Sequence, residues 1–143
     1  MYAKLTSDNK VEQYPYTLGD LRRDNKNVSF PRQVDANTLK EYRVYPVVVA
    51  DPPAYDPLTQ TAQEGTPTLI DEQWTVDWVV SALPTDDAER NVRFQRDELL
   101  KDTDWMAGSD VTMPSAWQIY RQALRDLPAQ VGFPNVTWPT KPS

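Results

Sequence analysis

The stretch DTDWMAGSDVTMPSAWQIYRQALRDLPAQVGFPNVTWPTKP, residues Asp102–Pro142, places a short amphipathic helix between aromatic and proline anchors. Thr112 can cap this helix, Pro114 suits its first position, and Pro128 stops it because the residue before a proline disfavours the helical conformation. The helix carries a broad apolar stripe at helical spacing, formed by Ala116, Trp117, Tyr120, Ala123, Leu124 and Leu127. The stretch is therefore predicted to be a packing module whose tail folds back over the helix.

A preceding helix is predicted from Pro84 to about Lys101. Asp86 is its expected N-cap, and Glu89, three residues later, would complete a capping box. The apolar stripe of this helix is narrow, because the positions that repeat at helical spacing are Ala88, Val92, Leu99 and Gln95 or Arg96. A stripe that narrow needs a partner, so the two helices are predicted to form an antiparallel hairpin whose loop is closed by Trp105.

The chain before this hairpin is predicted to be β-rich. Tyr2–Leu5 and Lys10–Tyr14 alternate in polarity around a turn-forming cluster and indicate a β-hairpin, which Pro15 is expected to end. The β-branched run Arg43–Val49 indicates a further strand, and Pro46 within it favours a sheet edge or a bulge.

Three more strands are expected in an antiparallel meander, over residues 58–63, 66–70 and 73–80. Trp74, Val76, Trp78 and Val80 would share one face, which indicates a half-buried strand. Single helical turns are expected from Thr17 and over Asn37–Tyr42, the second capped by Asp35 or Asn37.

These predictions give an α+β fold, an antiparallel meander followed by a two-helix hairpin with a proline- and tryptophan-containing tail. The expected domains are a β-rich docking domain, 1–83, and a helical-hairpin module, 84–143. Structural anchors are predicted at aromatic positions, namely Trp74, Trp78, Trp105, Trp117, Tyr120, Phe133 and Trp138.

The composition restricts the chemistry available to the chain. Its 143 residues include no histidine and no cysteine, which excludes imidazole and thiol catalysis, histidine or cysteine zinc sites, and disulfides. A net charge of −6, with 15 dispersed basic residues, disfavours nucleic acid and anionic membranes as partners. No stretch has the length of a signal peptide or a membrane span, so synthesis in the cytoplasm is expected.

Adjacent carboxylates are candidate catalytic or metal-binding groups, but each pair here has a local structural role instead. Asp71/Glu72 suit a turn, Asp86/Asp87 a helix start, and Asp97/Glu98 a helix surface. Asp102 and Asp104 with Asp110 lack the ligand number and glycine position of a calcium loop. No glycine-rich phosphate loop occurs, and we expect neither an enzyme nor a cofactor or metal.

Sequence motifs at both ends resemble proteins of tailed bacteriophages. The C-terminal third is similar to a module of tail-fibre, baseplate and fibre-assembly proteins, through Arg96–Leu100, Thr103–Trp105, Trp117–Asp126, Gly132–Pro134 and Trp138–Pro139. An N-terminal pattern of the same proteins is matched by Tyr14–Tyr16, Gly19–Asn25 and Ser29–Pro31. The resemblance implies a virion or virion-assembly protein made in the host cytoplasm, with other phage tail proteins as partners.

The first hypothesis from this resemblance is a structural subunit of the tail, in the baseplate, fibre attachment or an adaptor, located in the virion and oligomeric within its assembly. The alternative is a tail-fibre assembly chaperone. A glycan-binding adhesin tip and a capsid decoration protein rank below both.

Partner-binding residues are predicted on three surfaces. Val47 and Val49 lie on the expected edge strand, where another chain could add. The outward face of the second helix would present Gln118, Arg121, Gln122 and Arg125. Arg22 and Arg23 could meet an acidic neighbour, although a solvated loop beside Asp20 and Asp24 is the favoured interpretation of these two residues.

Overall fold

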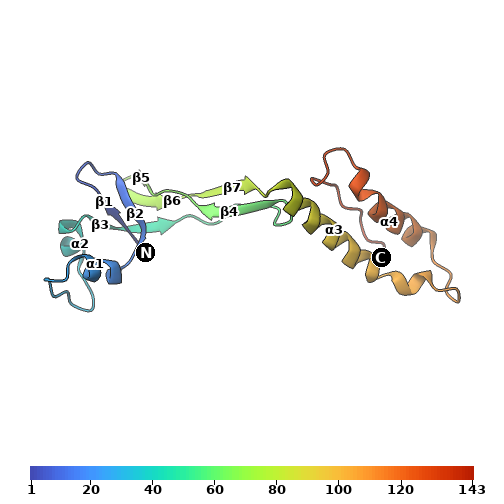
Figure 1. The fold of residues 1–143 in the computed structure, drawn as a ribbon, viewed down its shortest axis with the longest axis horizontal. Helices are drawn as coiled ribbons and strands as arrows, with labels where there is room; N and C mark the ends of the chain where they lie inside the picture. The colour runs from blue at the N-terminus through green and yellow to red at the C-terminus, as the bar shows by residue number, and fades with distance from the viewer. The chain divides into compact units, whose positions relative to one another are not determined.

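A computed structural model describes all residues, 1–143. The chain divides into two compact units. The β unit comprises Met1–Ala54 and Ala62–Val79, and the helical unit comprises Tyr55–Thr61 and Val80–Ser143. The mixed α+β class is confirmed, with a mostly antiparallel sheet, four α-helices and a C-terminal helical hairpin region (Figure 1). The predicted division of roles between a docking domain and a helical module stays a prediction.

The β unit is built on a five-stranded sheet in the order β2-β1-β3-β6-β5. Its strands are β1 (Tyr2–Leu5), β2 (Val11–Tyr16), β3 (Val44–Val49), β5 (Thr68–Ile70) and β6 (Gln73–Val76). The predicted hairpin β1–β2 is confirmed, and β5–β6 is also antiparallel. Strands β3 and β6 run parallel, which the alternation pattern did not predict.

Two short helices accompany this sheet, and the second has a predicted cap. Helix α1 (Leu18–Asp24) begins with a capping box between Thr17 and Asp20. Helix α2 (Ala36–Glu41) is capped by the Asp35 carboxylate, which accepts bonds from two backbone N–H groups. A first core cluster joins the helices to the sheet and consists of Tyr16, Leu21, Leu39 and Val44.

Both predictions from proline in the β unit were wrong. Strand β2 continues through Pro15 to Tyr16, and it tolerates the proline because it is an edge strand. Strand β3 is central, although it contains Pro46. Val47 N donates to Met1 O toward β1, so the nitrogen of Pro46 points toward β6, where the parallel pairing begins only at Val47. No ladder donor is therefore required of Pro46.

The predicted meander is also corrected. Strand β4 (Gln60–Glu64) pairs with β7 (Trp78–Ala82) in a separate two-stranded sheet, not with β5. The predicted strand 73–80 is interrupted at Asp77, where β6 ends and β7 follows. Alternation identifies a strand but carries no information about which strand lies beside it.

The helical unit contains α3 (Thr85–Lys101), the short 3₁₀ helix η1 (Asp104–Ala107), α4 (Ser115–Asp126) and a second 3₁₀ turn, η2 (Leu127–Ala129). Pro84 and Pro114 occupy the N-cap positions and no side chain caps either helix, so the predicted caps Asp86 and Thr112 were wrong. Asp86 and Asp87 lie in the first turn of α3, where the helix dipole favours them.

The core of the helical unit is the predicted one in outline. Tyr120, Leu124 and Leu127 are buried in one cluster, and Leu99, Leu100, Trp117, Val136 and Trp138 pack against it. The C-terminal end of α3, the stripe of α4 and the tail thus share one core. Trp117 meets Tyr120 edge to face, with ring centroids 5.9 Å apart.

Candidate interaction surfaces

The predicted edge-strand surface on β3 belongs to a strand that lies inside the sheet order, and its binding of a partner stays a prediction. Val47 is only 9% exposed and belongs to a second core cluster with Ala3 and Val76. Val49 is exposed, yet its strand lies between β1 and β6. The actual edges of the five-stranded sheet are β2 and β5, and Leu69 and Ile70 on β5 are exposed.

Arg22 and Arg23 lie on α1 and both are exposed. Arg22 donates to the carbonyl of Pro31 at 2.8 Å, which ties the following loop to the helix. Arg23 pairs with Asp20 at 2.7 Å, as the favoured solvated-loop interpretation predicts. Their binding of a partner stays a prediction.

The aromatic anchors divide into packed and exposed side chains. Trp74 packs on the second core cluster, and the indole N–H of Trp78 donates to the carbonyl of Ala50 at 2.8 Å. Phe133 lies under the guanidinium of Arg93, 5.0 Å from the ring centroid. Trp105 is 65% exposed, so its expected internal position is wrong. The 3₁₀ turn η1 carries its side chain away from the core.

The outward face of α4 has three of its four predicted members. Gln118, Gln122 and Arg125 are exposed and lie around Ile119, which is 70% exposed. A shallow depression of about 470 Å³ follows this face. The residues that line it are Ala107, Met113, Gln118, Ile119, Arg121, Gln122 and Arg125, and none of them is acidic.

Arg121 is the exception, because it is buried with only 5% of its surface exposed. Its guanidinium donates to the Leu100 carbonyl at 2.8 Å, to the Thr103 hydroxyl, and to the Asp104 carboxylate at 2.9 Å. The Leu100 carbonyl also accepts from the Thr103 N–H at 3.1 Å and from the Thr103 hydroxyl at 3.0 Å, so this cation adds a further donor to the end of α3. We call these residues the Arg121 clamp, and sequence reasoning missed it because arginine is rarely buried.

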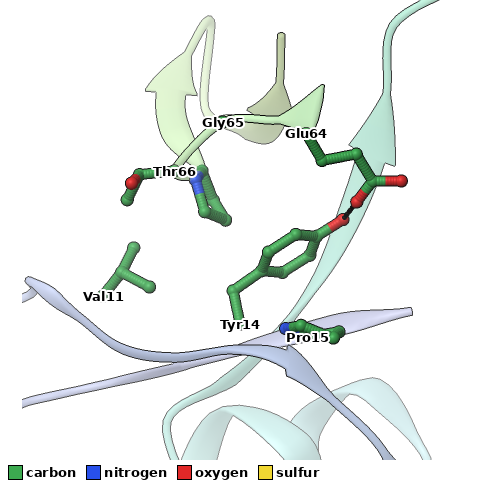
Figure 2. A pocket seen from close by; sticks show the side chains of 7 residues that line it. Val11, Tyr14, Pro15, Glu64, Gly65 and Thr66 are labelled. Carbon is green, nitrogen blue, oxygen red and sulfur yellow. Dashed lines mark hydrogen bonds between the residues drawn. The ribbon is translucent and has the colours of Figure 1, made fainter. Parts of the chain in front are cut away.

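Two tyrosines in the β unit form short contacts with carboxylates. Tyr14 on β2 donates to Glu64 at 2.5 Å, and burial together with this carboxylate raises the pKa of Tyr14 to about 12. Figure 2 shows both side chains at a shallow depression of about 470 Å³, with Val11 and Thr66 on its other side. Tyr16 donates to Asp24 at 2.8 Å, and burial, then that bond, raises the pKa of Tyr16. The same bond lowers the pKa of Asp24.

The structure contains no group of three or more carboxylates gathered as metal ligands. No helix combines the length and apolar character needed to cross a membrane. The carboxylate pairs singled out in the sequence lie in the predicted local settings, Asp71/Glu72 at the β5–β6 turn and Asp97/Glu98 on α3. What the surfaces offer is exposed apolar side chains rimmed by polar groups, an arrangement suited to protein contacts.

Comparison with protein families locates a match in the helical unit. Residues 89–143 match the model of a family described as phage tail assembly chaperone protein. The match indicates a phage tail-related protein. It begins on α3 and runs through α4 and the tail, so it covers the Arg121 clamp and the core of the helical unit. Neither the curated proteins nor the solved structures provide a match to the chain.

The resemblance to tailed-phage proteins inferred from the sequence motifs is thus supported at the level of the phage tail. The family description agrees better with the alternative prediction, an assembly chaperone, than with a structural subunit of the virion.

Proposed function

We propose that this protein is a phage tail assembly chaperone, which binds another tail protein during assembly and leaves before the particle is complete. The single observation that carries the proposal is the family match over residues 89–143. The partner is accordingly another phage tail protein, and the site of action is the cytoplasm of the host. We propose that the chain acts through protein contacts and not by catalysis.

The exposed apolar side chains of the helical unit support a binding role. Trp105 and Ile119 are each about two-thirds exposed or more, at 65% and 70%. Large apolar groups rimmed by polar residues mark protein interaction sites, because their burial against a partner is favourable. An assembly chaperone needs such a surface to cover apolar regions of an unassembled client.

The depression along α4 is the client-binding surface that we propose. Ile119 supplies an apolar contact and Arg125 a guanidinium beside it. The amides of Gln118 and Gln122 already donate once within the chain, to the Met113 carbonyl and the Asp126 carboxylate, and each has a second N–H for a client. The absence of acidic lining residues suits a client segment with an apolar residue flanked by carbonyl or carboxylate oxygens. Arg121 supports this surface from beneath, since its guanidinium is already bonded within the chain.

Complementation of a gene deletion in the encoding phage tests the proposal. We expect the deletion to reduce assembled tails and to leave one tail protein insoluble or degraded. The variant Gln118→Glu/Gln122→Glu/Arg125→Glu should fail to restore tails. The matched control Arg32→Glu/Gln33→Glu/Gln63→Glu, which makes the same charge change at exposed positions of the β unit, should restore them. Normal tails in the deletion strain would contradict the proposed function.

A further inference from the structure

We propose that helix α3 binds the same helix of a second copy of this chain, antiparallel and around a two-fold axis. The proposal concerns the face of α3 that points away from the core of the helical unit, and it does not depend on the chaperone role. We call this face the Phe94 face, and it consists of Asp87, Arg90, Phe94, Glu98 and Lys101.

The Phe94 face has no partner within the helical unit. The opposite side of α3 is the buried one, where Ala88 and Val92 are 2% and 1% exposed. At 100° per residue, Phe94 lies roughly opposite these two residues, and its ring is 67% exposed. An aromatic ring in this position near the middle of a 17-residue helix gains from a second apolar surface.

The charges of the Phe94 face are complementary to themselves when the helix is reversed. If Phe94 of one copy meets Phe94 of the other, Arg90 lies four residues before it and Glu98 four residues after it. An antiparallel partner therefore places Arg90 opposite the acidic pair Asp97 and Glu98.

The outer positions follow the same rule. Lys101, seven residues after Phe94, lies opposite Asp87, seven residues before it, and beside Asp86. In a two-fold interface each of these contacts occurs twice. A parallel pairing would instead place like charges side by side.

The intrachain ion pairs are already arranged for this pairing. Arg90 pairs with Asp87 at 3.0 Å, and Lys101 pairs with Glu98 at 3.7 Å. Both pairs run in the same direction along the helix, acid first and base three residues later. Two antiparallel copies would bring each pair against the reversed pair of the other copy, forming two four-charge networks.

The surface of α3 also contains a shallow depression that could accept the Phe94 ring of the second copy. This depression of about 450 Å³ lies along the helix, and its lining includes Arg90, Arg93, Phe94 and Asp97. These four residues have the i, i+3, i+4, i+7 spacing of the hole that accepts one side chain of a facing helix. Phe94 of the second copy can enter this hole beside the guanidinium of Arg90, since the guanidinium of Arg93 already lies over Phe133.

The expected dimer is weak and sensitive to salt. One helix pair buries far less than the roughly 1,600 Å² of a standard interface. Its charge contacts are exposed and are screened once the Debye length falls below their spacing. We expect dimers at low ionic strength that dissociate as salt is added, with at least about a tenfold rise in Kd between ~20 mM and ~500 mM salt.

Sedimentation equilibrium of the full chain, up to ~1 mM, tests the pairing through charge exchange. The variant Arg90→Glu and the variant Asp97→Lys/Glu98→Lys should each weaken self-association at least about tenfold, because each creates like-charge contacts twice. Mixed in equal amounts, the two variants should form a heterodimer, because every reversed charge then faces its opposite. Phe94→Ala should weaken the dimer about tenfold or more.

Controls separate this interface from general charge attraction and from unfolding. Arg125→Glu makes the same charge reversal as Arg90→Glu but lies on α4, so it should self-associate like the unaltered chain and should not rescue Asp97→Lys/Glu98→Lys. All reversed positions are exposed, and circular dichroism should show native helix content in each variant. The proposal would be overturned if the chain stayed monomeric at low salt. It would also be overturned if the charge-reversed variants associated as strongly as the unaltered chain.

Discussion

Replacing Arg121 by methionine is expected to destabilise the helical unit by about 2 kcal/mol. Methionine keeps most of the apolar stem and removes the guanidinium, together with its bonds to Leu100, Thr103 and Asp104. A hydrogen bond to a charged group contributes about 1.5–3 kcal/mol. The ion pair with the exposed Asp104 carboxylate adds at most about 1 kcal/mol. The substitution also removes the cost of keeping a cation buried, which offsets part of the lost stability.

Urea unfolding followed by circular dichroism and tryptophan fluorescence measures this change. Arg125→Met, the same substitution at an exposed position one turn later, should change the free energy of unfolding by no more than about 0.5 kcal/mol. Asp104→Asn should lower the free energy of unfolding by at most about 1 kcal/mol. The double variant Arg121→Met/Asp104→Asn should be only slightly less stable than Arg121→Met, because the ion pair is already lost. If Arg121→Met unfolded like the unaltered chain, the clamp would not stabilise the end of α3, and our account of this buried arginine would be refuted.

Two further predictions test the packing of each unit. Trp117→Ala should cost about 2–4 kcal/mol in urea unfolding because it removes the edge-to-face partner of Tyr120, whereas Trp105→Ala should cost no more than about 0.5 kcal/mol; equal losses would contradict the division of inside from outside. Because the pKa of Tyr14 is raised to about 12, protonated Tyr14 stabilises the fold fully below pH 10, and this contribution is lost as the pH rises from about 10 to about 12. Tyr14→Phe should flatten that part of the stability curve and remove one late step from the tyrosinate absorbance titration, whereas loss of a step near pH 10 would contradict the Tyr14–Glu64 contact.

Local signals in the sequence predicted the elements of this fold well. Asp35 caps its helix as expected, because a cap is decided by a few adjacent residues, whereas Pro84 and Pro114 take the places expected of Asp86 and Thr112. The stripe of α4 correctly placed Tyr120, Leu124 and Leu127 in one core. Such features need no knowledge of distant residues.

Strand pairing was beyond local signals. The parallel contact of β3 with β6 joins Val47 to Trp74, and nothing in either strand specifies the other. Pro46 indicated an edge strand because proline has no backbone N–H to donate. In the structure, residues Val44–Pro46 of β3 pair with β1 and residues Val47–Val49 pair with β6. Pro46 therefore lies where β6 requires no donor from it. Binding of a partner through Val47 and Val49 stays a prediction.

The prediction of side-chain burial was wrong at two residues, a buried arginine and an exposed tryptophan. Arg121 was expected outside because a buried cation is costly, yet the end of α3 provides oxygen acceptors that compensate for its burial. Trp105 was expected inside because it is large and apolar, yet η1 holds it in solvent. The face of α4 was therefore predicted in three of its four members, and the clamp beneath it was not.

Quantitative mass spectrometry, applied both to purified phage particles and to complexes isolated from the lysate of the encoding phage, tests the central claim most directly. A chaperone should be bound to one tail protein in the lysate and absent from finished particles, and the Gln118→Glu/Gln122→Glu/Arg125→Glu variant should lose that complex. A fixed stoichiometric amount of the chain in purified particles would contradict the account and would favour a structural subunit of the tail.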